Sequence, residues 1–344
     1  EVIYTSRQKL FDIARGKDRR PFFLVVSMTH PHDPYAVPQR YWERYRDSDI
    51  PMPRLGRADV PDDPHSRRLR HVIGLDLQTP TDAQIHAARR AYCGAVSYVD
   101  EQLGVVLDAL RESALERDTI VLVLADHGDM LGERGLWYKM NFFEPACRIP
   151  LMVSAPGRFP SRRSPALVSL LDIMPTLREL SGCAQPDHYA VPIDGRSLVP
   201  ELTGNDAPGE VIGEYLGEAA IAPVVMIRRG RHKFIHSPVD PDQLYDLVSD
   251  PDERRNLAAD EAHKSALAGF RDEVGRRWSL PHLHEGVLAS QRRRHLVYSA
   301  LRQGRYTPWD FQPTRDATRL YVRNDQELND VEAMARFPPP GARS

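Results

Sequence analysis

Cysteine is scarce in this chain of 344 residues, which contains only Cys93, Cys147 and Cys183. Three widely spaced cysteines cannot form the disulfide framework that stabilises small secreted domains. A low and odd number of cysteines is typical of proteins in a reducing compartment, so we expect a cytoplasmic location. Cys93 lies in a predicted helix, and the segments ACRIP and GCAQP around the other two contain no nearby base, so we interpret all three as structural.

Long apolar runs and a net charge are missing as well. No stretch approaches the 18 or so apolar residues of a transmembrane helix. The chain has 46 basic and 48 acidic side chains, which leaves a formal net charge of −2. Such a balance gives no overall attraction to nucleic acid or to a membrane surface. We therefore expect a globular protein that binds neither.

An initiator methionine and a signal pattern are also missing, because the chain starts with EVIYTSRQKL. We expect it to be the remainder of a longer protein, with any targeting information upstream. The length suffices for one large domain or two moderate ones.

Strand and helix patterns alternate in the first 200 residues. Apolar runs that predict strands lie at 21–30, 120–124 and 149–157. Apolar residues at helical spacing follow a possible N-cap at Thr81, and residues 167–182 predict a further helix. The polar stretch 40–79 predicts an irregular surface segment. The alternation favours a mostly parallel sheet covered by helices on both faces.

The pattern changes after about residue 200. Residues 224–237 have the alternation and the central glycine of a β-hairpin. Residues 243–257 predict a loop that leads into a helix at about 258–278. Together these segments predict a smaller, antiparallel α+β subdomain. From about residue 290 the chain is basic, then aromatic and irregular, and we expect an extended arm at its end.

Two charged residues follow the strand that is predicted at 120–124. Asp126 and His127 stand where a strand buried on both faces should end, and an unpaired charge there costs several kcal/mol. They could be an N-cap and a buried, satisfied histidine, or they could bind a cation. Oxygen ligands suit Ca²⁺ or Mg²⁺, and an imidazole widens the choice to Mn²⁺ or Zn²⁺.

Three further residues are candidates for binding an anion. Lys139 lies among apolar and aromatic neighbours in GLWYKMNFFE, an unusual place for a solvated ammonium. It could bind a small oxyanion as a point charge. His32, in the proline-rich loop after residue 30, is either a surface histidine or a general acid for a leaving group. His30 is a weaker candidate for the same role.

Several segments resemble the sulfatase family of the alkaline-phosphatase superfamily. They are THPHDPY, LADHGDMLGERGLWYKMNFFEPACRIPLMV, VSLLDIMPTL and LYDLVSDPDERRNL, and they occur in the family's order. The segment from Arg292 to Asn324 resembles the C-terminal extension of the choline sulfatases within that family.

The resemblance implies an α/β fold, an alkaline-phosphatase-like α/β/α sandwich. Residues 1–200 would belong to the catalytic domain, 201–288 to a C-terminal α+β subdomain, and 289–344 to the choline-sulfatase extension and its arm. It also implies hydrolysis of a sulfate ester, most specifically of choline sulfate to choline and sulfate.

The resemblance further implies roles for single residues. Asp126 and His127 would be metal ligands, and His32 and Lys139 would contact the sulfate group. Ca²⁺ is the metal expected of the family, and Mn²⁺ stays open because many relatives have asparagine in place of His127. For the quaternary ammonium of choline, which aromatic faces and carboxylates bind, the candidates are Glu214, Glu218, Trp309, Asp325 and Asp330. The arm would reach a neighbouring subunit of a homo-oligomer.

The chain departs from the family in one respect. The family's nucleophile is a formylglycine made from the cysteine of Cys-x-Pro-x-Arg, and none of the three cysteines stands in that motif. We expect the motif to lie in an N-terminal portion outside these residues, and the 344 residues alone to be inactive. Two other functions remain open: a phosphonate monoester or phosphodiester hydrolase of the same superfamily, and a non-catalytic relative that binds an anion.

Overall fold

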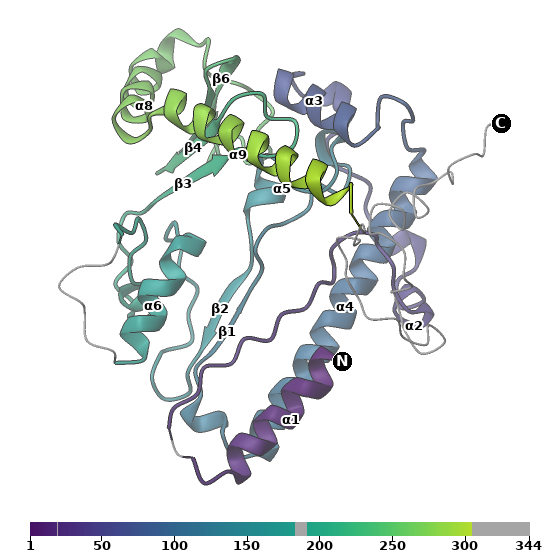
Figure 1. Ribbon diagram of the computed structural model, residues 1–344, viewed down its shortest axis with the longest axis vertical. Helices are drawn as coiled ribbons and strands as arrows, with labels where there is room; N and C mark the ends of the chain where they lie inside the picture. The colour runs from purple at the N-terminus through teal and green to yellow at the C-terminus, as the bar shows by residue number, and fades with distance from the viewer. Residues whose placement is uncertain (19, 183–190, 305–344) are drawn as a thin grey trace.

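The computed structural model of the protein describes residues 1–18, 20–182 and 191–304. Its elements are shown in Figure 1. The helices are α1 (Val2–Arg15), α2 (Gln39–Trp42), α3 (Pro64–Val72), α4 (Asp82–Glu112), α5 (Glu144–Cys147), α6 (Ile173–Leu180), α7 (Val199–Thr203), α8 (Lys264–Arg277) and α9 (Leu280–Leu301). The strands are β1 (Val121–Leu124), β2 (Leu151–Ser154), β3 (Glu210–Tyr215), β4 (Val224–Arg229), β5 (His232–Ser237) and β6 (Asp240–Asp246).

Helix α4 is the long helix that the sequence predicts. Thr81 is its N-cap: the Thr81 hydroxyl accepts a hydrogen bond from the amide of Gln84, whose side chain accepts from the amide of Thr81. This reciprocal pair satisfies amides that have no partner inside the helix. Helix α1 lies along α4 (Figure 1). Leu10 of α1 packs with Val106 and Leu110 of α4.

Strands β1 and β2 pair antiparallel, with Val121 opposite Ser154. In the described residues every strand pair is antiparallel, so the mostly parallel sheet that the sequence predicts is not formed there. A parallel return needs a crossover connection, usually a helix. Between β1 and β2 the longest helix is α5, with four residues. Strand β1 is also not buried on both faces, since Leu124 is 40% exposed.

The strand expected at 21–30 is not formed. None of these residues joins a strand ladder in the described structure, and the side chains of Phe23 and Val25 are 74% and 70% exposed. An apolar run becomes a strand only where another strand offers hydrogen bonds, and the described part of the chain offers none here.

Part of the predicted surface segment 40–79 is helical. Helix α3 begins after Asp63, whose carboxylate accepts the amide of Ser66, and Pro64 occupies the first turn. Its sequence PHSRRLRHV has few apolar residues, so periodicity alone does not indicate it. The capping Asp63 and the proline after it were the signals in the sequence that could have predicted this helix.

Strands β3 to β6 form a four-stranded antiparallel sheet in sequence order. The hairpin of β4 and β5 confirms the prediction for 224–237, and Gly230 at its turn has φ +53°. Strand β6 takes up residues 243–246, which the sequence assigned to a loop. Helix α8 covers one face of the sheet through Leu267 and Phe270.

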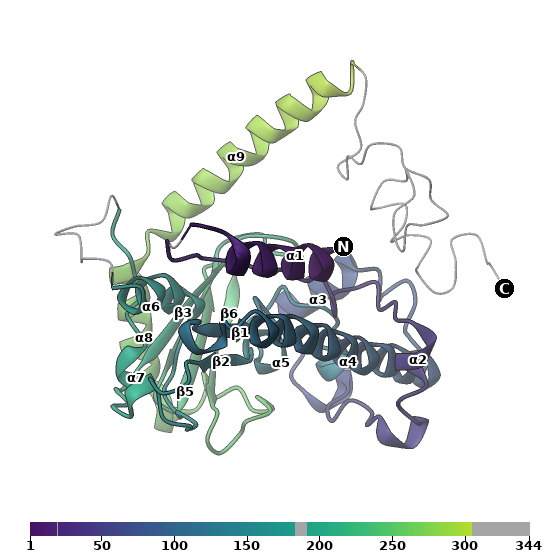
Figure 2. The same ribbon diagram turned by 90° about the horizontal axis from the view of Figure 1, so that it is seen from below.

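Helix α9 replaces the irregular chain expected from residue 290 up to Leu301, and it crosses the predicted boundary between residues 288 and 289. Of its residues only Leu280 is buried. Figure 2 shows α9 extending away from the rest of the molecule. No described helix has both the length and the apolar composition to cross a membrane.

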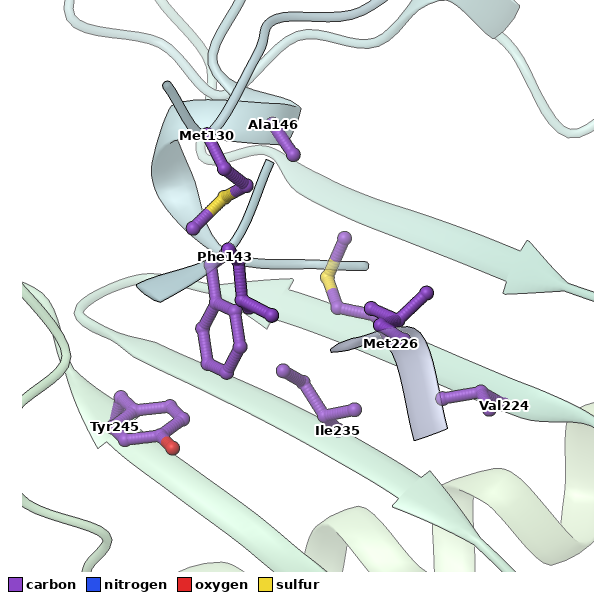
Figure 3. Close-up of a cluster of buried hydrophobic side chains, with 9 residues drawn as sticks. Met130, Phe143, Ala146, Val224, Met226, Ile235 and Tyr245 are labelled. Atoms are coloured by element: carbon purple, nitrogen blue, oxygen red, sulfur yellow. The ribbon is translucent and has the colours of Figure 1, made fainter. Parts of the chain in front are cut away.

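The core that supports the site lies between the loop 126–150 and the four-stranded sheet. Met130, Phe143 and Ala146 approach from the loop, and Ile235 and Tyr245 from the sheet (Figure 3). The rings of Phe143 and Tyr245 meet edge to face, with centroids 6.3 Å apart. The loop after β1 is therefore fixed on the four-stranded sheet.

Candidate functional site

The loop after β1 carries Asp126 and His127 side by side. His127 Nδ1 lies 2.8 Å from the carbonyl oxygen of Gly128 and donates to it, so Nε2 carries the free lone pair. That atom lies 3.5 Å from Asp126 Oδ2. The Asp126 side chain is 84% exposed. The sequence argument that this carboxylate is buried and needs compensation is therefore wrong, because β1 ends at the surface.

His32 and Lys139 meet beside this pair. Lys139 Nζ lies 2.6 Å from His32 Nε2. His32 Nδ1 lies 2.8 Å from the carbonyl oxygen of Asp33 and 3.1 Å from its carboxylate. The imidazole therefore donates from Nδ1 and accepts the Lys139 ammonium at Nε2. The rings of His32 and His127 are 6.0 Å apart.

The structure thus brings together the four residues for which the sequence predicts metal or sulfate contacts. His30 is oriented differently. Its ring packs edge to face on Tyr98, with centroids 5.3 Å apart, and its Nε2 lies 3.3 Å from the carbonyl oxygen of Ala36. These contacts give it a structural role in the loop, and substrate contact by His30 stays a prediction.

Asp129 is a residue of the site to which the sequence argument gave no role. Its Oδ2 accepts the hydroxyl of Tyr35 at 2.7 Å, and its Oδ1 accepts the amides of Leu131 and Tyr138. Burial raises the pKa of Asp129 above its usual value. Asp129 therefore joins the His32 loop to the Lys139 loop. In the sequence, its place in the motif DHGD was the only indication that Asp129 belongs to the site.

The backbone around Lys139 is unusual. Both neighbours, Tyr138 and Met140, have positive φ, of 64° and 54°. Such conformations cost free energy in residues other than glycine and persist only where surrounding contacts impose them. Asn141 Nδ2 donates to the Lys139 carbonyl at 2.5 Å, and His65 Nε2 donates to the Met140 carbonyl at 2.8 Å. His65 is buried, which lowers its pKa and keeps the ring neutral.

Gly128 allows a close approach between two parts of the loop. Its amide donates to the carbonyl oxygen of Ala146 at 2.8 Å. A Cβ at this position would lie 2.0 Å from the carbonyl oxygen of Pro145. The segment that follows Lys139 is therefore in contact with the backbone beside His127.

Asp126 and His127 fit part of a metal site. Two donor atoms 3.5 Å apart can both contact one cation, since oxygen and nitrogen ligands lie roughly 2.0–2.6 Å from Ca²⁺, Mn²⁺ or Zn²⁺. Across the described ranges, no group of three or more His, Cys, Asp or Glu side chains could hold a metal ion. These residues supply a partial ligand set.

The candidates for contact with choline are only partly described. Glu214, on β3, accepts a hydrogen bond from the Trp278 indole at 2.5 Å. Glu218 accepts the hydroxyl of Tyr215 through its carbonyl and its carboxylate. Both glutamates are exposed. Trp309, Asp325 and Asp330 lie outside the described residues.

The two cysteines in the described part of the chain have free thiols. Burial raises the pKa of Cys147 to about 12, so its thiol stays protonated at neutral pH. Cys93 lies within α4, and its pKa is also raised by burial. Cys183 lies outside the described residues.

Known family models match most of the chain. Residues 4–183 match the sulfatase family, and residues 132–277 match the C-terminal model of N-sulphoglucosamine sulphohydrolase. Residues 285–337 match the model described as the choline sulfatase enzyme C terminal.

Relatives and solved structures agree with these matches. The chain is 41% identical to the choline-sulfatase of Rhizobium meliloti (strain 1021), over 98% of this chain and 67% of that protein. The phosphonate monoester hydrolase of Silicibacter pomeroyi is 30% identical, with a TM-score of 0.62, and 72% of this chain matches 53% of it. The enzyme of the same name from Agrobacterium radiobacter is 25% identical, with a TM-score of 0.67, and 82% of this chain matches 60% of it.

The chain therefore spans about two thirds of the choline-sulfatase and little more than half of the two hydrolases. The structural likeness confirms the predicted α/β fold class. The sulfatase model covers more than half of the residues, and the resemblance first suggested by motifs such as LADHGDMLGERG holds along the chain. This chain belongs to the sulfatase family.

Proposed function

We propose that the protein hydrolyses a sulfate ester, and that choline sulfate is its substrate. The observation that carries the proposal is the meeting of Lys139 and His32 beside Asp126 and His127. An ammonium and an imidazole at one point, next to two possible metal ligands, form a site for a small tetrahedral anion. The likeness to the choline-sulfatase of Rhizobium meliloti supports the choice of ester.

Each residue of the pair has a chemical task in such a reaction. Negative charge grows on the sulfate and leaving-group oxygens as the ester bond breaks. Lys139, held in place by its backbone contacts, stabilises this charge without reorganising. His32, when protonated, can give its Nε2 proton to the departing oxygen. The Asp33 carbonyl and carboxylate beside Nδ1 stabilise the imidazolium and orient its ring.

Sulfatases in general use a divalent metal and a formylglycine. Asp126 and His127 would hold the metal, which supplies Lewis-acid stabilisation of the sulfate oxygens when bound. We propose Ca²⁺, with Mn²⁺ as the other candidate because His127 contributes a nitrogen ligand. No cysteine of these 344 residues stands in Cys-x-Pro-x-Arg, and we propose that residues outside them supply the formylglycine.

The cation of choline needs its own site. A quaternary ammonium has no hydrogen to donate, so carboxylates and aromatic faces bind it. We propose Glu214 and Glu218 for this role, with Trp309, Asp325 and Asp330 from the C-terminal segment. We also propose that this segment, which lies in the part of the chain that matches the choline sulfatase C terminus, joins subunits of a homo-oligomer. A cytoplasmic location is proposed from the cysteine content alone.

A second candidate is the hydrolysis of phosphonate monoesters, which the likeness to two such hydrolases favours. Relative rates separate the two. The protein, expressed from its own complete reading frame, should have a higher kcat/KM for choline sulfate than for an aryl sulfate or a phenyl phosphonate ester. A preference for the phosphonate would replace the first proposal by the second.

Truncation tests whether the C-terminal segment binds the choline cation. Removal of the residues after Asn324 should raise the KM for choline sulfate far more than the KM for a neutral aryl sulfate, and it should weaken the oligomer in sizing experiments. Equal losses on both esters, with an unchanged oligomer, would assign the C-terminal segment no part in choline binding.

A further inference from the structure

A buried cluster of charges lies beneath the loop that carries Lys139. Lys233, on β5, is 1% exposed, and its ammonium donates to Glu253 Oε1 at 2.8 Å. The same nitrogen lies 2.5 Å from Glu144 Oε1 and donates to the carbonyl of Phe142 at 2.8 Å. Burial lowers the pKa of Lys233, but the Glu253 and Glu144 carboxylates outweigh it and raise the pKa. The ammonium is therefore charged and fully partnered.

Glu253 also contacts the segment that follows Lys139. It is 1% exposed, and its Oε2 accepts the amide of Glu144 at 2.8 Å. Its carbonyl accepts the guanidinium of Arg134 at 2.7 Å, and that guanidinium lies 3.9 Å from the centre of the Phe143 ring. Two buried residues of the C-terminal subdomain, Lys233 and Glu253, thus hold the backbone and side chains of residues 142–144.

The segment 142–146 connects the two halves of the candidate site. It begins three residues after Lys139, and its far end lies against Gly128, whose amide donates to Ala146. A shift of this segment would move Lys139 relative to Asp126 and His127. The strained backbone at Tyr138 and Met140 makes the loop dependent on such external contacts.

A buried ion cluster is not the simplest way to stabilise a core. Replacing buried ion pairs by apolar side chains is often neutral or stabilising. In some proteins buried charges instead contribute conformational specificity, because they favour one arrangement of the chain over others. Here each charge has a specific backbone or side-chain partner in the segment 142–144.

We propose that Lys233 and Glu253 are positioning residues, which set Lys139 relative to Asp126 and His127 through the segment 142–146. The placement of the loop can be measured without any assumption about the reaction. That placement serves sulfate hydrolysis only if the proposed function is right.

Hydrogen exchange tests the placement. In the double variant Lys233→Met/Glu253→Gln both buried charges are removed together, and the Glu144 carboxylate that loses its ammonium partner is 29% exposed. The amides of Gly128 and Met130, which donate to Ala146 and Tyr138, should exchange faster by about tenfold or more, as expected when one or two buried hydrogen bonds are lost. The amides of β4 should keep their protection.

Arg271→Met is the matched control. It removes the hydrogen bond from Arg271 to the buried carboxylate of Asp242, in the same sheet but away from the loop. Exchange at Gly128 and Met130 should not change. Unchanged exchange at these amides in the double variant would overturn the proposal. Loss of protection throughout β4 would also overturn it, because the pair would then stabilise the whole subdomain.

Activity gives a second and independent readout. The double variant should lower kcat/KM in the wild-type background and add little in a Lys139→Ala background, because its effect passes through Lys139. The same loss in both backgrounds would contradict a positioning role. If Lys139→Ala itself loses no activity, the proposed function fails, whereas the exchange result is unaffected.

Discussion

The ammonium nitrogen of Lys139 lies 2.6 Å from Nε2 of His32, although the two residues are 107 positions apart in the sequence. The lone pair of the imidazole accepts a hydrogen bond from the ammonium, as an anionic oxygen of a bound substrate would. A sulfate oxygen that enters the site would bind both groups, Lys139 directly and His32 once it is protonated. The contact therefore marks the point where we expect the ester to bind.

Two groups that act on the same oxygens should not contribute independently. His32→Ala and Lys139→Ala should each cost about 2–4 kcal/mol of transition-state stabilisation. The double variant should cost less than the sum by about 1 kcal/mol or more, as found for residues in direct contact. Measurement of kcat/KM for all four proteins on one sulfate ester gives the coupling. Strict additivity would mean that the two side chains act at different places.

The metal prediction rests on the 3.5 Å between Asp126 and His127. Asp126→Ala should remove bound metal and activity together, because the exposed carboxylate supplies the oxygen ligand of the pair. His127→Asn should be tolerated, or it should shift the metal preference from Mn²⁺ toward Ca²⁺, since an oxygen ligand replaces a nitrogen. Elemental analysis of the purified variants measures both. Full metal occupancy and activity in Asp126→Ala would show that the ion binds elsewhere.

The close approach at Gly128 gives a prediction about stability. Gly128→Ala would place a methyl group 2.0 Å from the Pro145 carbonyl oxygen, so the loop must move. We expect a loss of about 1–3 kcal/mol in the free energy of unfolding, as for other overpacked sites. The control is Gly104→Ala in α4, where the new methyl group meets no atom within 4 Å beyond the adjacent backbone of its own helix. That change should stabilise the helix by roughly 0.5–1 kcal/mol. Similar effects of the two changes in urea unfolding would mean that the loop tolerates the methyl group.

The packing of α8 should be sensitive to acid. Hydrogen bonds from Arg277 and Arg276 hold the pKa of Glu273 at about 2, below its usual value near 4.5. A lowered carboxylate pKa contributes stability above pH 4.5, and this contribution is lost as the pH falls toward 2. Because two of its arginine partners are partly exposed, we expect Glu273→Gln to cost only about 1 kcal/mol at pH 7.

The loss of unfolding free energy in Glu273→Gln should shrink steadily when unfolding is measured at decreasing pH between 4.5 and 2. The exposed pair of Glu261 and Lys264 provides the control, and Glu261→Gln should have no measurable effect at any pH. A loss in Glu273→Gln that does not depend on pH would show that packing, rather than charge, explains it.

Much of the fold could be predicted because local signals decide it. Helix α4 has a capping threonine and a long apolar face, and the hairpin of β4 and β5 has a glycine at its turn. Residues 21–30 could not be assigned in this way. Their composition is that of a strand, but a strand also needs a partner, and sequence composition does not supply one. Helix α9 was missed because it is mostly exposed and has no strong apolar face.

The site could be predicted in part for a similar reason. Asp126, His127 and Lys139 share one motif, and the second segment with His32 follows another apolar run. Lys233, Glu253 and His65 could not be found, because lysine and glutamate usually lie at the surface and histidine is intermediate in burial. Only the packing of the sheet and α3 against the loop reveals that these three are buried and hold it.

Sulfate release from choline sulfate is the measurement that tests the account most directly. The protein, expressed from its own complete reading frame and supplied with Ca²⁺ or Mn²⁺, should release sulfate and choline in equal amounts. Lys139→Ala should lower kcat/KM by about 10²–10³ with its metal content unchanged, the effect of losing one donor to the developing charge. No sulfate release from the wild-type protein, or full activity in Lys139→Ala, would contradict the account.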